Sequence, residues 1–160
     1  MIDKRIIDFI QEHHLLTLST SKENIPYCCN VFYIYDEKNN SLIFSSDIKT
    51  KHVKDFIENP NVAASIALET KDVEKIQGVQ LLGTITELKA EELNNATKQY
   101  LKEFPYAEKM KLHLWQMKLT FIKMTDNKLG FGKNLFGKFN DSYIFQKVLF
   151  GGCLNLQEFP

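Results

Sequence analysis

The spacing of hydrophobic positions changes several times along the chain, and each change marks an expected element. Near the N-terminus, Ile6, Phe9 and Ile10 recur at the three- and four-residue spacing of an amphipathic helix. From residue 15 the pattern shifts to short runs of β-branched and aromatic residues, which are typical of strands. The expected order is helix, three strands, short helix, two strands, long helix and strand, over residues 2–12, 15–20, 27–35, 41–46, 50–58, 62–68, 76–88, 90–104 and 113–125.

Turn and helix-capping residues set the expected boundaries. Residues 22–26 are expected to form a turn, and the polar residues 36–40 a hairpin loop. Thr50 is a suitable N-cap for the short helix, and Pro60 is expected to stop it. Gly78 and Gly83, inside the longest expected strand, predict a bulge or bend.

Six strands in so short a chain, one of them long and bent, predict a mainly β (α+β) protein built on a small closed or partly closed antiparallel barrel. The helices are expected to cover its ends. A doubly wound parallel fold would need regular alternation of strands and helices, which the pattern lacks.

Composition narrows the class of protein. The chain has 160 residues, of which 44% are hydrophobic, enough for one domain with its own core. Twenty Lys and Arg balance twenty Asp and Glu, so the basic excess typical of nucleic-acid binders is missing and no nucleic-acid partner is expected. No apolar run approaches the roughly 20 residues of a membrane helix, and no signal-peptide core is present. We therefore expect a cytoplasmic protein without a membrane partner.

Cysteine and histidine spacing gives no metal site. Cys28 and Cys29 are adjacent, Cys153 is distant, and none forms a disulfide framework or a C-x-x-C motif. The four histidines lack zinc-site spacing relative to any cysteine. If Cys28 and Cys29 lie in a strand, they point to opposite faces, and packing is favoured over a redox role.

The most informative stretch for chemistry is residues 45–54, where a strand ends and a helix begins. Free N–H groups and the helix dipole favour an anion at a helix N-terminus. Hydroxyl and basic side chains gather there: Ser45, Ser46, Lys49, Thr50, Lys51, His52 and Lys54. The stretch predicts a site for a phosphate monoester on a small ligand. The alternative is a solvated, lysine-rich helix start.

Other candidates are weaker. Gly130-Phe-Gly-Lys133 lacks the spacing of a P-loop or a dinucleotide fingerprint, so taken alone it is a glycine-bearing turn. No G-x-S-x-G nucleophile elbow and no obvious carboxylate pair is present, so the catalytic residues are unknown. Trp115, Phe32 and Tyr33 could stack on a planar ring or belong to the core.

The order of these motifs resembles a known family. Four segments together resemble the central signature of the pyridoxamine-phosphate-oxidase-like FMN-binding split barrels: Tyr35–Lys38, Leu42–Ser46, Lys49–His52 and Glu58–Val62. Gly78–Thr84 is similar to their long fifth strand. Tyr100–Pro105 and Thr125–Lys133 are similar to a small bacterial branch of that superfamily, and the resemblance covers about residues 5–135.

The resemblance implies a six-stranded antiparallel split β-barrel with flanking helices as an FMN-binding domain over residues 1–133, with 134–160 as a C-terminal extension. It also implies a homodimer with FMN in a cleft between subunits, acting as an oxidoreductase on a small-molecule substrate. The residues that it assigns to the phosphate and ribityl end of FMN are Ser45, Ser46, Thr50, Lys51 and His52. Backbone groups around Cys29, Asn30 and Val31 would face the flavin ring, Gln80 would reach the partner's flavin, and Trp115 and Lys133 would complete the site.

Two departures limit the functional expectation. His52 stands where the family more usually has a Lys or Arg, and a neutral imidazole binds phosphate less strongly than a fixed cation, so a modest or pH-dependent affinity for FMN is expected. Pyridoxamine-phosphate oxidases carry R-L-H-D-R near the C-terminus, whereas this chain has Lys128-Leu-Gly-Phe-Gly-Lys133, so that particular activity is not expected. Two alternatives remain open. One is a haem-binding or haem-utilising split barrel, in which His13, His14, His52 or His113 would bind the iron. The other is a non-enzymatic binding module with an altered flavin site.

Overall fold

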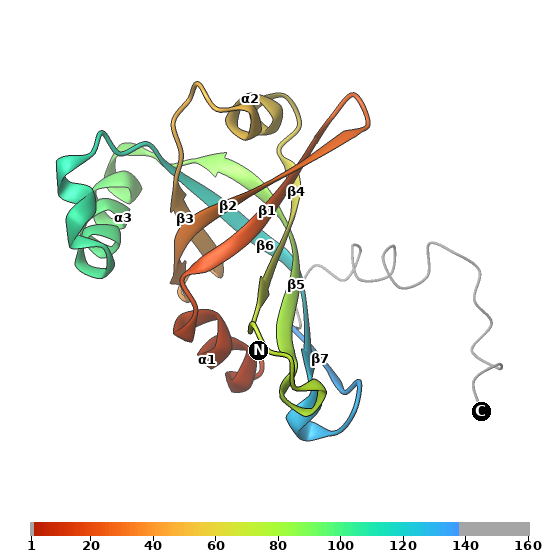
Figure 1. The fold of residues 1–160 in the computed structure, drawn as a ribbon. Helices are drawn as coiled ribbons and strands as arrows, with labels where there is room; N and C mark the ends of the chain where they lie inside the picture. The colour runs from red at the N-terminus through yellow and green to blue at the C-terminus, as the bar shows by residue number, and fades with distance from the viewer. Residues whose placement is uncertain (1, 138–160) are drawn as a thin grey trace.

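The computed structural model describes residues 2–137, which form one barrel with attached helices (Figure 1). Its α-helices are α1 (Lys4–Glu12), α2 (Lys51–Glu58) and α3 (Ala90–Glu103). Its strands are β1 (Leu15–Lys22), β2 (Ile25–Asp36), β3 (Ser41–Ser45), β4 (Asn61–Ala67), β5 (Gln77–Glu87), β6 (Leu114–Asp126) and β7 (Asn134–Phe136). Short 3₁₀ turns occupy η1 (Val73–Lys75), η2 (Pro105–Lys109) and η3 (Asn127–Leu129).

The first six strands close into a barrel. They follow the order β3-β2-β1-β4-β5-β6, every pairing is antiparallel, and β6 pairs back onto β3. The predicted six-stranded antiparallel barrel with flanking helices is confirmed. β7 pairs with residues 123–125 near the end of β6, so the sheet continues three residues past the domain boundary expected at residue 133. The rest of the expected C-terminal extension lies outside the described residues.

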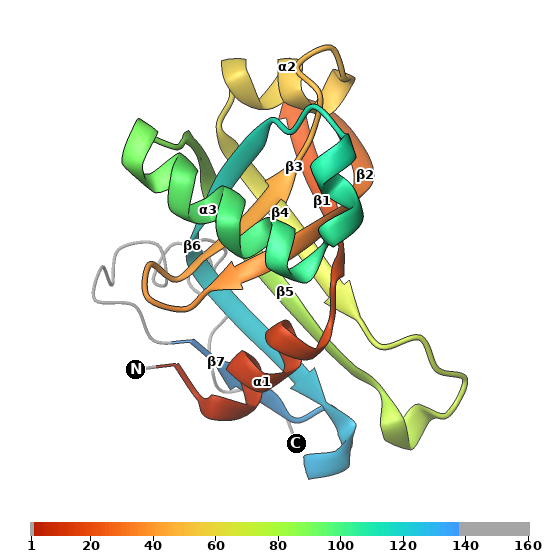
Figure 2. The same cartoon turned by 90° about the vertical axis from the view of Figure 1, so that its left-hand side faces the viewer.

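Side-chain alternation along the strands fills the barrel. Leu16 and Leu18 of β1 point inward with matching residues of the other strands, and Ile6, Phe9 and Ile10 of α1 close one end. Helix α2 packs Val53 and Phe56 into the other end. Helix α3 lies across the outside of β2 and β3 (Figure 2) and builds a second, smaller cluster, made of Ile43, Leu88, Ala96, Tyr100, Phe104, Ala107 and Leu114.

The predicted bulge lies at Gly83. The β5–β6 register shifts between Leu82 and Gly83, leaving Thr120 as the extra residue of β6. A Cβ atom on Gly83 would lie 2.5 Å from the Lys118 carbonyl oxygen and 2.9 Å from Met117. Only a glycine lets the two strands approach this closely, and the bulge lets the long strand β5 curve around the barrel. Gly78, by contrast, pairs in regular register.

The hairpin of β1 and β2 differs from the expected one. Its turn is only Glu23 and Asn24, with φ values of 53° and 62°, where a turn over residues 22–26 was expected. Two consecutive positive φ values match the right-handed twist of a two-residue hairpin. The strands are therefore longer than predicted, and Figure 1 shows the resulting ribbon projecting beside α2.

The barrel is split along β2. This strand pairs with β1 over residues 25–32 but with β3 only over residues 33–36. Within the described chain, the first two-thirds of β2 therefore have a strand on one side only. This open edge runs beside the end of the barrel that α2 covers.

Candidate functional site

The open edge of β2 presents free backbone groups of Cys28 and Asn30. Tyr33 N donates to His14 O at 3.0 Å, so odd-numbered residues of β2 direct their N–H and C=O groups towards β1. Even-numbered residues direct theirs away from β1, onto the edge that β3 does not reach. No backbone partner for Cys28 or Asn30 on that side occurs within residues 2–137.

Side-chain contacts between β1 and β2 agree with this alternation of odd- and even-numbered residues. Thr17 Oγ1 donates to Asn30 Oδ1 at 2.9 Å, and Ser19 Oγ lies 2.9 Å from Cys28 Sγ. Such close cross-strand contacts are typical of antiparallel pairs that do not exchange backbone hydrogen bonds. The side chains of Cys28 and Asn30 thus lie on the outer face, while their backbone groups line the open edge.

The connection from β3 to α2 forms a corner of polar groups, which we call the phosphate corner: residues 46–52. Ser46 Oγ lies 2.7 Å from His52 Nε2, and Thr50 Oγ1 lies 3.2 Å from the same nitrogen. Thr50 occupies the N-cap position as predicted, but its hydroxyl donates to Asp47 O at 2.7 Å and caps no helix N–H. The first N–H groups of α2 therefore lack a side-chain cap.

His52 is nearly buried and uncharged. Its residue is 9% exposed, and burial lowers its imidazole pKa more than the nearby Asp55 carboxylate raises it. The Thr50 hydroxyl has committed its proton to Asp47 O, so it can only accept from His52 Nε2. We infer that this nitrogen carries a proton, and the lowered pKa leaves the ring without a second proton near neutral pH, so His52 is there a neutral hydrogen-bond donor.

Lys51 is held by a buried carboxylate. Its Nζ lies 2.7 and 2.9 Å from the two oxygens of Asp55, and Asp55 is only 2% exposed. Thr20 of β1 donates a further hydrogen bond to Asp55 at 3.1 Å. These contacts, the Lys51 bond foremost, hold the pKa of the Asp55 carboxyl below its usual value. The ammonium also lies 5.1 Å from the ring centre of Tyr27, which links the corner to β2.

Trp115 of β6 holds the corner from the barrel side. Its Nε1 donates to Ser46 O at 3.1 Å, and its ring packs edge-on against Phe56 of α2 with centroids 4.8 Å apart. Ser46 N in turn donates to His113 O at 3.0 Å. Trp115 thus fixes the backbone where β3 ends, and it is the only tryptophan of the chain.

The structure brings some of the predicted site residues together and separates others. Contacts join Ser46, Thr50, Lys51, His52 and Trp115 at the corner. Ser45 alternates with the core residue Phe44, so its side chain faces the α3 side of the strand and only its backbone borders the corner.

The three residues predicted on β2 take different orientations. Val31 belongs to the core, Cys29 packs against the core, and Asn30 points outward. The adjacent Cys28 and Cys29 thus lie on opposite faces, as expected for a strand. The groups of this segment that are available to a ligand are the backbone groups of Cys28 and Asn30, one residue to either side of Cys29.

Gln80 and Lys133 lie away from the corner within one chain. Gln80 lines a shallow hollow of about 420 Å³ on the outer face of β1, β2, β4 and β5, together with Cys28 and Ser65. Lys133 directly precedes β7, and its backbone bonds to Asp126 and Gly130; β7 lies at the end of the barrel opposite α2 (Figure 1).

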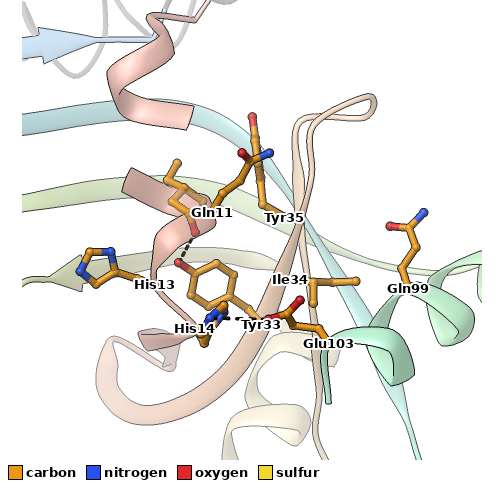
Figure 3. Close-up of a pocket in the computed structure, with 9 residues that line it drawn as sticks. Gln11, His13, His14, Tyr33, Ile34, Tyr35, Gln99 and Glu103 are labelled. Atoms are coloured by element: carbon orange, nitrogen blue, oxygen red, sulfur yellow. Dashed lines mark hydrogen bonds and ion pairs between the residues drawn. The ribbon is translucent and has the colours of Figure 1, made fainter. Parts of the chain in front are cut away.

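A second pocket, of about 230 Å³, lies between α1, β2 and α3 (Figure 3). His14 and Glu103 face each other across it, with 3.6 Å between Nε2 and Oε1. Tyr33 closes its floor by donating to Ile10 O at 2.7 Å. His13 is turned back onto its own helix, where Nδ1 lies 2.9 Å from Phe9 O.

Sequence reasoning missed Asp55 and Thr20. The four-residue spacing from Lys51 to Asp55 on a helix is a readable signal for an ion pair. The contribution of Thr20 is not readable, because it lies 35 residues earlier and meets Asp55 only through the packing of α2 on β1.

Within residues 2–137, no group of three or more His, Cys, Asp or Glu side chains is arranged to hold a metal ion. No helix in the same range is both long and apolar enough to cross a membrane.

Comparison with known proteins places this geometry in a family. The model of the pyridoxamine 5'-phosphate oxidase family matches residues 2–126. The UPF0306 protein YE0465 of Yersinia enterocolitica is 37% identical over 131 residues, covering 82% of this chain and 89% of that protein. The UPF0306 protein PM1958 of Pasteurella multocida is 35% identical, covering 79% of this chain and 85% of that protein.

Solved structures share the fold at low identity. A heme binding protein from Mycobacterium smegmatis has a TM-score of 0.70 and 15% identity, covering 85% of this chain and 58% of that one. A FAD-binding protein from Mesorhizobium loti has a TM-score of 0.62 and 14% identity, covering 78% and 94%. The family match spans both the phosphate corner and the open edge of β2, and the chain belongs to the pyridoxamine 5'-phosphate oxidase family.

Proposed function

We propose that this protein is an FMN-binding flavoprotein that acts as an oxidoreductase on a small substrate. The observation that carries the proposal is that the N-terminus of α2 lies next to the open edge of β2, and the two suit different ends of one ligand. The uncapped N–H groups of α2 suit a phosphate, and the free N–H and C=O groups of Cys28 and Asn30 suit the polar edge of a planar ring. The contact of Lys51 with Tyr27 joins the two features.

Each part of the site has a distinct task in this proposal. The first turn of α2, with Ser46, Thr50 and His52 beside it, would hold the phosphate and ribityl end. The open edge of β2 would orient the ring, and FMN itself would supply the redox chemistry. We expect the protein in the cytoplasm, as its composition indicates.

We further propose a homodimer that packs through the outer face of β1, β2, β4 and β5. Support comes from the hollow of about 420 Å³ on that face, whose lining includes small residues such as Ala63 and Ser65. Gln80 and Lys133 lie apart from the corner of their own chain, so a second copy is the simplest way for them to approach a flavin. Gln80→Arg should yield a monomer in light scattering; an unchanged dimer would place the interface elsewhere.

The direct test is an absorbance titration of the purified protein with FMN at equilibrium. We expect a saturable shift of the two flavin bands at about one FMN per chain, followed by bleaching when a nicotinamide donor is added. No saturable shift would refute flavin binding. A shift without any bleaching, with either nicotinamide donor, would favour the non-enzymatic binding module.

Haem binding is a second candidate, because His14 offers an accessible imidazole. It is nearly half exposed and lines the pocket between α1 and α3, whereas His52 is nearly buried. A haem titration separates the two candidates. A Soret shift that His14→Ala removes would support haem, and an unshifted band would leave FMN as the ligand.

A further inference from the structure

The groups that would hold the phosphate are already engaged with one another. Ser46 Oγ is 2.7 Å from His52 Nε2, and the Thr50 hydroxyl donates to Asp47 O at 2.7 Å. A bound phosphate would have to compete with Asp47 O for the Thr50 proton, whereas the Ser46 hydroxyl accepts from His52 Nε2 and keeps its own proton. The gain from a new bond to Thr50 is therefore a difference between two similar interactions, which is small.

The corner also lacks the cation best suited to phosphate. A guanidinium can grip phosphate with two parallel hydrogen bonds, and such pairs are stronger than a single ammonium contact. Arg5 is the only arginine of the chain, and its Nη2 lies 2.6 Å from Asp3 Oδ2 at the start of α1. The imidazole of His52 is neutral and adds no charge.

The charge of Lys51 is balanced from inside the protein. Both oxygens of Asp55 contact the ammonium of Lys51, at 2.7 and 2.9 Å. Asp55 is only 2% exposed, so burial keeps its carboxylate beside Lys51 when an anion arrives. Lys51 and Asp55 together present an incoming phosphate with almost no net charge, and the fixed carboxylate repels it.

We propose that Asp55 keeps the phosphate corner weak, so that FMN exchanges between the protein and solution instead of remaining bound as a permanent prosthetic group. This inference rests on the proposed FMN site and adds how firmly that site holds its ligand. Asp55 acts through Lys51 and need not touch the flavin, so it is a positioning residue. Reversible binding would let the same site take up and release flavin in successive turnovers.

The test compares FMN with riboflavin, which has the same ring but no phosphate. Equilibrium dissociation constants of both are measured for the wild-type protein, for Asp55→Asn and for Thr20→Val. Thr20→Val is the matched control, because it removes a hydrogen bond from the same cluster but keeps the carboxylate charge. The preference for FMN over riboflavin reports the phosphate alone, and general loosening of the fold would weaken both ligands together.

We expect wild-type protein to bind FMN with a dissociation constant of about 1 μM or weaker and to lose it on desalting. Asp55→Asn should raise the preference for FMN over riboflavin about tenfold, and Thr20→Val should leave it unchanged. FMN that survives desalting, or an unchanged or lower preference in Asp55→Asn, would overturn the inference while leaving FMN binding intact. No binding of FMN to any variant would instead refute the proposed function and the inference together.

Discussion

Replacing Trp115 with phenylalanine tests how the phosphate corner is held. The change keeps an aromatic ring near Phe56 but removes the 3.1 Å hydrogen bond from Nε1 to Ser46 O. Ser46 is 9% exposed, so its carbonyl has little access to water as a replacement partner. Leaving such an acceptor unsatisfied costs about 1–3 kcal/mol, and the smaller ring adds a cavity contribution of similar sign.

We therefore expect Trp115→Phe to lower the free energy of unfolding by about 2 kcal/mol, or roughly 6 °C in Tm for a chain of this size. Urea denaturation followed by circular dichroism measures it. Tyr106→Phe is the matched control, because Tyr106 is an exposed aromatic residue of η2 and should change stability by less than about 0.5 kcal/mol. If Trp115→Phe is as stable as the control, the Trp115 hydrogen bond does not hold the corner and the reasoning fails.

Two further changes test the bulge and the state of His52. Gly83→Ala should destabilise the protein by about 1–3 kcal/mol in the same urea assay, because a Cβ atom would lie 2.5 Å from Lys118 O. A variant as stable as the wild-type protein would mean that β5 and β6 tolerate a side chain there. Burial lowers the His52 pKa, so the unfolded chain binds more protons, and stability should fall as the pH drops through and below about 6.5. His52→Gln should flatten that fall, and an unaltered pH profile would mean that His52 is not the titrating group.

Much of the fold follows from local signals in the sequence. Strand periodicity, Pro60 after α2 and the N-cap position of Thr50 place most elements within a few residues. The predicted turn over residues 22–26 is wrong because it includes Pro26, a residue that favours turns in sequence. Pro26 instead sits in β2 at an even-numbered position, where its missing N–H faces the open edge and no ladder bond is lost.

The candidate site was predictable in its position but not in its charge balance. The sequence places Lys51 at a helix start, and from there a phosphate role is a natural reading. The four-residue spacing indicates the Lys51–Asp55 ion pair, but only tertiary packing reveals that α2 buries Asp55 against Thr20. A Lys51→Glu variant would therefore place a second carboxylate beside the buried Asp55. The paired change of Lys51→Met with Asp55→Asn removes both charges of the ion pair and leaves no buried charge without a partner.

The measurement that bears most directly on the central claim is the fluorescence of Trp115 during titration with FMN. It is the only tryptophan, and its indole bonds to the backbone of the phosphate corner, so a flavin bound there would quench it. We predict saturable quenching at about one FMN per chain, with a midpoint near 1 μM or weaker and a weaker response to riboflavin. Quenching that rises linearly, as for free tryptophan mixed with FMN, would contradict the account.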